Sequence, residues 1–553
     1  MTKQKLKIGL LLDDHNIPAW VYKMVEMIGS SKHSEISLIV KKTRVTNQNG
    51  DSAFRRIWRN RNVLLYKLYS NLDYKIFKWK PDAFERKNIL NLVNCKEIEV
   101  NVGKNLTDDH LLPEDISRIN EKPIDVFINI GFQSLQKEVI KIPKYGIWTY
   151  RHDTYQNGIT SFSGVWEVLE QEDITEATLE VLTADGNKIL YRSYSHTDEL
   201  SVYRNKNNFY WKSSSFVPRK LEELYRLGEK TFLKNIDQNN TELSSVANKK
   251  LKKAPGNYEI LIKIGANYLL ALKRKVRRMF YIKQWILLYK VGTSPKIPKS
   301  FFDYNRIVPP KDRIWADPFV LFRDGKYFVF IEEMLYAENK GKISVIEINK
   351  NGKYEMPKVI IENNYHMSYP LLFEDGDDLF MLPETGANLT IELYKCVDFP
   401  LRWEFHSTLM ENVRAADATL FKYKGRYWLF TNMREVQGAS VQDELFLFYS
   451  DDFQNGTWQS HPENPIVSDV RCSRPAGNIF EHEGRIYRPA QNGGKHYGYG
   501  MQINEIVTLT EEFYQEREVQ SIHPNWAKDL IGTHTLNADG GLTVIDALIK
   551  RRK

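Results

Sequence analysis

Three carboxylates stand at the ends of apolar hairpins in the second half of the chain: Asp317, Glu384 and Asp417. Polar groups at the ends of otherwise apolar strands are hard to explain as core residues, and they indicate a binding site. Carboxylates at a suitable separation support the cleavage of a glycosidic bond, and their distance decides the stereochemical outcome. The chemistry that these residue types predict, if they meet in space, is therefore that of sugars.

Arginines stand at comparable hairpin ends, namely Arg414, Arg471, Arg474 and Arg488. A guanidinium group binds phosphate or carboxylate through two parallel hydrogen bonds. An anionic ligand such as a sugar phosphate, a nucleotide diphosphate or a uronic acid follows from such a cluster. The alternative is that the arginines pair internally with acidic residues of the same hairpins. An anionic ligand and internal pairing are compatible if the ligand displaces the internal pairs when it binds.

The elements that must position these side chains are recurring β-hairpins. The first, residues 314–333 (IWADPFVLFRDGKYFVFIEE), consists of an apolar strand, an Asp-Gly turn and a second apolar strand. Copies begin at Ser368, Asp417 and Arg474, and a looser copy begins at Thr533. Their spacing of about 50 to 60 residues is that of propeller blades, and Asp-Gly tolerates the positive φ of a tight hairpin. The pattern predicts an all-β five-bladed propeller over residues 285–553.

Antiparallel pairing places the start of a hairpin's first strand and the end of its second strand at one edge. If the first strand of each blade lines the central channel, these ends converge on one funnel. Glu332 and Asn432 also stand at such ends. The residues that we expect to bind substrate there are Trp315, Glu333, His366, Ser368, Tyr369, Arg414, Arg474, Arg488, Gln491 and His534.

Five short motifs carry a family resemblance: WADPF at Trp315, HMSYP at His366, LPETG at Leu382, FP-x-x-W at Phe399 and RPAG at Arg474. From about residue 285 onward the chain resembles the N-terminal domain of plant glucosamine inositolphosphorylceramide transferase. It resembles more remotely the five-bladed glycoside hydrolases of the arabinanase and fructosidase type.

The hydrolase resemblance implies roles for the three carboxylates. Asp317 matches the base or nucleophile, and Asp417 matches the orienting carboxylate. Arg474 stands where the hydrolases have a general-acid glutamate. The resemblance therefore implies Glu384 as the substitute acid.

The first half of the chain alternates apolar runs at 7–12 (KIGLLL), 36–40 and 125–130 with a helical pattern at 19–29, which predicts an α/β domain with a parallel sheet. Residues 125–192 resemble the formyltransferase fold of enzymes that formylate methionyl-tRNA or amino-sugars. This resemblance implies a Rossmann-type domain over residues 1–235 with a second catalytic site.

The formyltransferase resemblance also implies site residues. His152 stands where the family has its histidine, and Asp185 where it has its aspartate. Tyr150 replaces the family's asparagine, whose amide stabilises the oxyanion of formyl transfer. His152 and Asp185 are therefore the second pair of catalytic candidates.

Residues 236–284 are expected to form a linker and a basic helix. This helix carries Lys273, Arg274, Lys275, Arg277 and Arg278. These cations predict either contact with an anionic membrane surface or a solvated helix between domains.

Composition and charge limit the class of protein and its cellular location. The net charge of +8 does not by itself indicate nucleic acid, and three scattered cysteines make neither a disulfide framework nor a thiolate metal site. The amino terminus reads as a first strand rather than a signal peptide, and no apolar run is long enough to span a membrane. We expect a cytoplasmic protein, at most peripheral to the inner membrane face.

The function that these features predict is a transferase that builds or modifies a cell-surface glycan or glycolipid. It would hold a sugar or sugar phosphate in the propeller funnel and use a formyltransferase-like site in the first domain. The alternatives are a non-catalytic glycan-binding scaffold and a glycoside hydrolase that uses Asp317 and Glu384. The sequence shows no metal-ligand motif, and it does not choose between formyl-folate and a nucleotide-sugar as the co-substrate.

Overall fold

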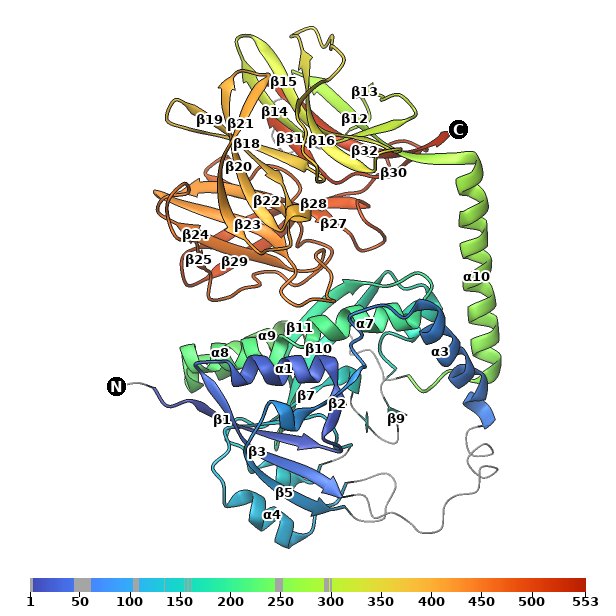
Figure 1. Ribbon diagram of the computed structural model, residues 1–553, viewed down its shortest axis with the longest axis vertical. Coiled ribbons are helices and arrows are strands. Elements are labelled where there is room, and N and C mark those ends of the chain that lie inside the picture. The colour runs from blue at the N-terminus through green and yellow to red at the C-terminus, as the bar shows by residue number, and fades with distance from the viewer. Residues whose placement is uncertain are drawn as a thin grey trace. The chain divides into compact units, whose positions relative to one another are not determined.

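The computed structural model describes residues 3–43, 61–102, 109–133, 135–153, 155–156, 159–160, 162–243, 252–292, 298 and 301–553. The chain forms two compact units, whose elements are labelled in Figure 1. The N-terminal unit comprises Met1–Ala271 with Val436–Ala439, and the C-terminal unit comprises Leu272–Glu435 with Ser440–Lys553. Each unit has hydrophobic clusters of its own.

The N-terminal unit is built on a seven-stranded sheet of order β11-β10-β7-β6-β1-β3-β5. The strands are β1 (Leu6–Leu12), β3 (Ser34–Thr43), β5 (Lys96–Asn101), β6 (Val126–Asn129), β7 (Ile147–Tyr150), β10 (Ile174–Thr183) and β11 (Gly186–His196). Strands β5, β3, β1, β6 and β7 are parallel, whereas β10 is antiparallel to both β7 and β11. The α/β prediction is confirmed, but the sheet is mixed rather than parallel throughout.

Helices cover both faces of this sheet. The helices before the propeller are α1 (Ala19–Gly29), α3 (Leu64–Phe77), α4 (Pro113–Asn120), α5 (Lys137–Ile140), α6 (Trp166–Glu170), α7 (Val202–Ser213), α8 (Phe216–Leu227), α9 (Glu229–Leu243) and α10 (Asn257–Phe280), of which α10 continues into the C-terminal unit. Leu10 and Leu12 pack with α1, α7 and α8, whereas Leu11 packs on the other face with Ile119 of α4. This apolar run is continuous because β1 is buried on both faces.

Short strands complete the unit, namely β2 (Asn16–Pro18), β4 (Arg86–Asn88), β8 (Tyr155–Gln156) and β9 (Ile159–Thr160). Strand β2 pairs with β4 and β8 with β9. Much of the linker predicted before α10, residues 244–251, lies outside the described residues.

The C-terminal unit is a propeller of five β-sheet blades, as the hairpin repeat predicted. Blade one is β14 (Arg313–Arg323), β15 (Lys326–Leu335), β16 (Lys340–Ile348) and β17 (Lys358–Ile361); blade two is β18 (Ser368–Asp375), β19 (Asp378–Glu384), β20 (Thr390–Asp398) and β21 (Arg402–Glu411). Blade three is β22 (Ala415–Tyr423), β23 (Arg426–Met433), β24 (Leu445–Ser450) and β25 (Gln459–Ser460); blade four is β26 (Phe480–His482), β27 (Arg485–Asn492), β28 (Gly500–Leu509) and β29 (Tyr514–Ile522).

Blade five joins the two ends of this unit. Its strands are β12 (Tyr281–Val291), β13 (Asn305–Ile307), β30 (Leu530–Gly532), β31 (Leu536–Asp539) and β32 (Leu542–Arg552). Strand β12 pairs with β32 over its whole length, from Tyr281 opposite Arg552 to Val291 opposite Leu542. This pairing closes the ring and removes the open edges that the two terminal strands would otherwise leave.

The hairpin turns follow the chemistry of the sequence. In the first turn Asp324 has φ of 51° and Gly325 has φ of 77°. Two consecutive residues with positive φ make the turn type that matches strand twist. Lys424-Gly425, Glu483-Gly484 and Gly540-Gly541 repeat this pattern in blades three, four and five.

Candidate functional site

A β-bulge interrupts the first strand of blades one, two and three at the same place. One residue in each bulge has a left-handed backbone, with φ of 50° at Asp317, 48° at Tyr369 and 51° at Asp417. The strand pairing slips between Ala316 and Phe319, between Ser368 and Leu371, and between Ala416 and Thr419. Left-handed non-glycine residues are uncommon and strained, and a bulge re-aims a side chain. The same bulge in three blades changes the direction of the side chains of Asp317, Tyr369 and Asp417 relative to a regular strand.

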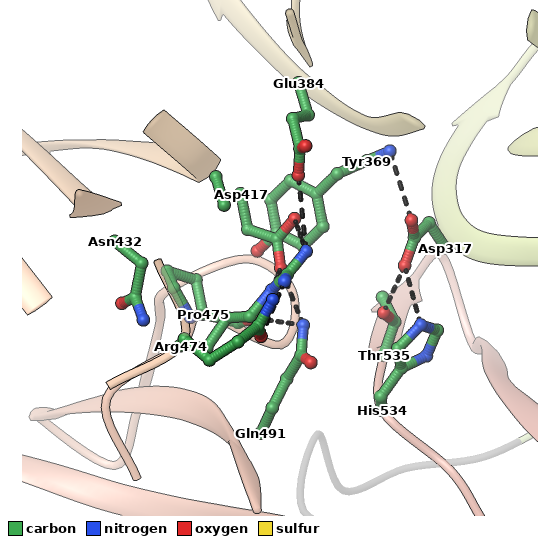
Figure 2. A network of polar contacts seen from close by, with 12 residues as sticks. Asp317, Tyr369, Glu384, Asp417, Asn432, Arg474, Pro475, Gln491, His534 and Thr535 are labelled. Carbon is green, nitrogen blue, oxygen red and sulfur yellow. Dashed lines mark hydrogen bonds and ion pairs between the residues drawn. The ribbon is translucent and has the colours of Figure 1, made fainter. Parts of the chain in front are cut away.

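The centre of the site is an ion pair between Arg474 and Asp417 (Figure 2). Arg474 Nε lies 2.5 Å from Asp417 Oδ2, and Nη2 lies 3.0 Å from Oδ1, so the contact is bidentate. The same Nη2 lies 3.3 Å from Glu384 Oε2. One guanidinium from blade four therefore bridges carboxylates from blades two and three.

Further side chains hold this bridge in place. Gln491 donates from Nε2 to Asp417 Oδ2 at 2.6 Å, and Arg474 Nη1 donates to Gln442 Oε1 at 2.7 Å. The ring of Tyr497 lies 5.1 Å from the Arg474 guanidinium carbon. Tyr497 is 48% exposed whereas the Arg474 side chain is 9% exposed. Tyr497 therefore lies between the buried ionic centre and solvent.

A second cluster surrounds Asp317. Its Oδ1 accepts a hydrogen bond from Thr535 Oγ1 at 2.8 Å, and its Oδ2 accepts one from the Tyr369 backbone N–H at 3.3 Å. His534 Nε2 lies 3.6 Å from Asp317 Oδ1, and the His534 ring is stacked on Trp285 at 4.1 Å between centroids. These contacts join blade one to blades two and five (Figure 2).

Asp546, on β32, orders the backbone behind this cluster and is fully buried. Its carboxylate accepts backbone N–H groups of His534 at 2.8 Å, Thr535 at 3.1 Å and Asp317 at 3.2 Å. It also forms an ion pair with His534 Nδ1. Asp317, His534 and Asp546 each offer one ligand atom within 4.8 Å of one another, so this is where a metal ion could be held within the described residues.

The contacts run through all five blades. Asp317 belongs to blade one, Glu384 to blade two, Asp417 to blade three and Gln491 to blade four, whereas Arg474 lies just before the first strand of blade four and His534 lies between β30 and β31 of blade five. Residues of five blades can share one chain of contacts only at the propeller axis. We call this group the axial site, defined as Asp317, Glu384, Asp417, Arg474, Gln491 and His534.

Burial sets the electrostatics of the axial site. It raises the pKa of Glu384 to about 8, and the nearby charge of Asp417 adds to the effect. It raises the pKa of Asp317 to about 6; His534 opposes this shift, whereas Asp417 and Asp546 support it. Glu384 is therefore largely protonated at neutral pH. Two carboxyl groups with separated pKa values are what acid and base roles require.

Glu332 and His366 stand beside the axial site. Burial, followed by the charges of Asp317 and Glu384, raises the pKa of Glu332 well above its usual value. His366 Nε2 lies 3.4 Å from Glu332 Oε1, and His366 Nδ1 accepts the Gly341 backbone N–H at 2.9 Å. Burial lowers the pKa of His366, and Arg414 and Arg474 lower it further. Glu332 therefore adds another acidic group whose neutral form is favoured.

Several residues predicted to bind substrate have contacts within the fold that the sequence did not predict. Trp315 packs in a hydrophobic cluster with Leu287 and Val544. Glu333 pairs with Arg313 at 2.8 Å and accepts the Ser344 hydroxyl at 2.7 Å. Because Glu332 and Glu333 are consecutive in a strand, they point to opposite faces. Ser368, at the start of β18, is buried opposite Glu384 in the pairing with β19.

The four arginines predicted to bind an anionic ligand pair with partners in the protein itself. Arg488 is buried and pairs with Glu516 of β29, two strands away in its own blade. Arg471 pairs with Asp469, and Arg414 donates to the backbone carbonyl of Gly386. Arg474 contacts the carboxylates of Asp417 and Glu384, so the alternative of internal pairing describes this centre.

Four residues of the site were missed by the strand-end argument: Gln442, Tyr497, Thr535 and Asp546. Asp546 carries the one signal that could have found it, a carboxylate in the middle of the apolar run LTVIDALI. Gln442 and Tyr497 lie outside the named strands. No strand pattern points to them.

The two formyltransferase-like candidates lie apart. His152 is buried at the carboxyl end of β7, in ring contact with Trp20, Tyr150 and Tyr210. Asp185 is exposed at the turn between β10 and β11. Since β10 runs antiparallel to β7, with Leu182 opposite Ile147, this turn lies at the amino end of β7. A His152–Asp185 pair is therefore not formed.

Fold and site together define a five-bladed β-propeller with a carboxylate-rich axial site. Residues 308–533 match the family model described as glucosamine inositolphosphorylceramide transferase 1, N-terminal. The Arabidopsis thaliana protein named glucosamine inositolphosphorylceramide transferase 1 is 30% identical over 207 residues, which cover 37% of this chain and 27% of the relative. Its namesake from Oryza sativa subsp. japonica is 30% identical over 204 residues, which cover 36% of this chain and 27% of the relative.

The chain thus spans 27% of the length of these curated relatives. The family match lies within the propeller. Among solved structures, Zg3597, a family 117 glycoside hydrolase from Zobellia galactanivorans, is 11% identical with a TM-score of 0.32, covering 48% of this chain and 90% of that chain. A likeness at this score carries no argument about activity.

Proposed function

We propose that this protein is a transferase that builds or modifies a cell-surface glycan or glycolipid, with a sugar bound at the axial site. The observation that carries the proposal is that carboxyl groups of blades two and three meet around one guanidinium, with Asp317 of blade one in the neighbouring cluster (Figure 2). The relatives' names support the same chemistry, since both are called glucosamine inositolphosphorylceramide transferase 1. The match covers 27% of the length of these relatives, and the family model that it includes is described as N-terminal.

The charge of the axial site indicates which class of sugar would bind there. Asp317, Glu384 and Asp417 meet Glu332 and Asp546 there, whereas Arg474 is engaged by Asp417 through two hydrogen bonds. A phosphate or uronate would have to compete with these carboxylates for Arg474. A neutral sugar, or an amino-sugar whose ammonium group complements the acids, suits this excess of carboxyl groups better than the sugar phosphate that the arginine positions suggested.

Each carboxyl group has a role that its surroundings support. Glu384 favours its protonated form and would act as the general acid toward a leaving oxygen. Asp317, held by Thr535 and the Tyr369 backbone, would stabilise positive charge that develops at the sugar ring or attack it. Asp417 is held by Arg474 and Gln491 and would position Arg474.

A calorimetric titration of the full chain tests this assignment. Glucosamine and glucose should bind more tightly than glucose phosphate, and Asp317→Asn should weaken binding of the first two. Nucleotide-sugars should be screened in the same way as donors. If none of these compounds binds, or if Asp317→Asn leaves every affinity unchanged, the axial site is not a sugar site.

A non-catalytic glycan-binding scaffold is the second candidate function. The contact of Arg474 with both Asp417 and Glu384 favours it, because a fixed cation in that position neutralises charge that a hydrolase or transferase would use. Sugar binding without turnover, unchanged by Glu384→Gln, would support the scaffold. Release of free sugar by the wild type, lost in Glu384→Gln, would instead support the hydrolase alternative.

We also propose a second substrate site, formyltransferase-like, in the N-terminal unit. The order of the parallel strands is β5-β3-β1-β6-β7, and ligands of doubly wound sheets bind where the strand order reverses, which here would be beyond the carboxyl ends of β1 and β6. A folate or nucleotide would bind there rather than at a His152–Asp185 pair. Binding of a formyl-folate analogue that is insensitive to Asp185→Asn would support this placement, and no binding would remove the second site from the proposal.

A further inference from the structure

Helix α10 (Asn257–Phe280) presents an apolar arc to solvent along its whole length. At 3.6 residues per turn, the arc from Tyr258 to Phe280 spans roughly 120° of the helix and contains no charged residue. Its members include Leu261, Tyr268, Leu272 and Met279, and every bulky member is at least 43% exposed. In the first half of the helix the opposite side packs on the fold, whereas residues 272–280 are exposed all round.

The inward side of α10 is fixed by specific contacts. Ile260 and Asn267 are buried, and Asn267 donates from Nδ2 to the Val168 carbonyl at 2.9 Å. Ile260 packs in a hydrophobic cluster with Val168 and Val202. The orientation of the helix is therefore set by its core side, and the apolar arc is left facing outward.

Helix α3 (Leu64–Phe77) presents a second apolar stripe. Leu64, Leu68, Leu72 and Ile76 recur at every fourth residue and are each 46% to 66% exposed, and Trp79 follows with 57% exposure. Asn257 at the start of α10 ties the helices together, because its Oδ1 accepts the Leu65 backbone N–H and its Nδ2 donates to the Arg61 carbonyl. The two helices lie side by side there (Figure 1).

Cations border the apolar arc of α10. Lys273 and Arg277 lie along one side of the arc and Lys275 along the other, and all three are exposed. The helix has one acidic residue, Glu259, against six lysines and arginines. An exposed apolar face bordered by lysine and arginine is the pattern of a helix that lies in the surface of an anionic bilayer.

We propose that α3 and α10 form a docking surface for an anionic phospholipid membrane, with the apolar arcs entering the bilayer interface and the cations contacting the headgroups. Soluble proteins rarely expose a continuous apolar patch of this kind without a partner. A second copy of the chain is the weaker occupant, because pairing two α10 helices brings together twelve cations and two acids. Among the described helices none has the length and apolar composition to cross a bilayer. The docking surface does not depend on the proposed sugar site.

Vesicle co-sedimentation of the full chain tests the proposal. The wild type should bind vesicles of phosphatidylcholine with phosphatidylglycerol, and should bind pure phosphatidylcholine weakly. Lys273→Glu with Arg277→Glu should weaken binding to the anionic vesicles at least about tenfold. Leu269→Ser with Leu272→Ser should weaken binding to both kinds of vesicle.

Matched variants control for charge and apolar surface as such. Lys424→Glu with Lys528→Glu changes two exposed cations on the propeller, and Val507→Ser with Val519→Ser changes two exposed apolar residues of blade four. Both controls should bind anionic vesicles like the wild type, and all variants should keep the wild-type melting temperature. A wild type that binds no vesicles, or α10 variants that bind like the controls, overturns the proposal. A dimer in light scattering that Leu269→Ser with Leu272→Ser dissociates, without vesicle binding, assigns the face to a second copy instead.

Discussion

Arg474 and Asp417 are joined by two hydrogen bonds although 57 residues separate them in the chain. Asp417 is 1% exposed, so Arg474 and its other protein partners replace water around its carboxyl group. Removing one member of a buried ion pair leaves the other charge uncompensated, which is far more costly than removing both. The axial site is therefore a structural element of the propeller as well as a candidate binding site.

We expect Arg474→Met to lower the free energy of unfolding of the propeller by about 3 to 5 kcal/mol. Chemical denaturation followed by circular dichroism measures the change. Arg434→Ala, at the same edge of blade three but exposed, should stay within about 0.5 kcal/mol of the wild type. A double variant with Asp417→Leu should recover part of the loss. Equal effects of the two arginine variants would show that the Arg474–Asp417 pair contributes little to the free energy of unfolding.

The raised pKa values of Glu384, about 8, and Asp317, about 6, predict how stability depends on pH. Both groups bind protons more tightly in the folded state than in the unfolded state, where they titrate near 4.5 and 3.8. Their contribution to the free energy of unfolding is therefore complete below about pH 4 and is lost as the pH rises through 6 and 8. We expect the melting temperature of the propeller to fall between pH 5 and pH 9.

Glu384→Gln should make this decline shallower, since the amide stays neutral. Differential scanning calorimetry at several pH values measures it. Glu404→Gln, on the exposed strand β21, should leave the pH profile of the wild type unchanged. A Glu384→Gln profile parallel to that of the wild type would mean that Glu384 is ionised in the folded protein near its ordinary pKa.

Asp546→Ala should be strongly destabilising, by about 3 kcal/mol or more, because three buried backbone N–H groups lose their acceptor. Asp546→Asn keeps an acceptor oxygen and should cost less. Although burial opposes it, Asp546 followed by Asp317 raises the pKa of His534, so both variants should lower that pKa in an NMR titration. Asp377→Ala, in an exposed turn, is the matched control. An unchanged His534 titration would remove Asp546 from the electrostatics of the axial site.

Tyr497 should act as a stacking surface for the sugar. Tyr497→Ala should lower the affinity for the bound sugar on the order of tenfold, about 1.4 kcal/mol, with little change in melting temperature. Tyr497→Phe, which keeps the ring, should bind like the wild type. Tyr354→Ala, an exposed tyrosine of the same unit, controls for the loss of an aromatic surface. Equal affinities of Tyr497→Ala and the wild type would place the ligand elsewhere.

The hairpin repeat was readable from the sequence because each blade is a local unit. Asp-Gly turns between apolar strands fix the pairing of neighbours, and the start of one strand then lies opposite the end of the next, as Ser368 lies opposite Glu384. The convergence of Asp317, Glu384, Asp417 and Arg474 follows from closing five such units around one axis. The sequence did not show which of Glu332 and Glu333 lies beside the axial site, because this depends on which face of β15 is turned toward the axis.

The sequence by itself determined the blade pattern, the turns, the α/β character of the first unit and the strand ends on which acidic residues stand. Only the tertiary structure decided that Trp315 packs in the core, that Arg488 pairs within its own blade and that Asp185 lies at the far end of β7 from His152. It also brought Asp546 beneath His534. The reason is physical: turns and strands are set by neighbouring residues, whereas bulges, strand direction and the closure of blade five by β12 and β32 set where a side chain finally points.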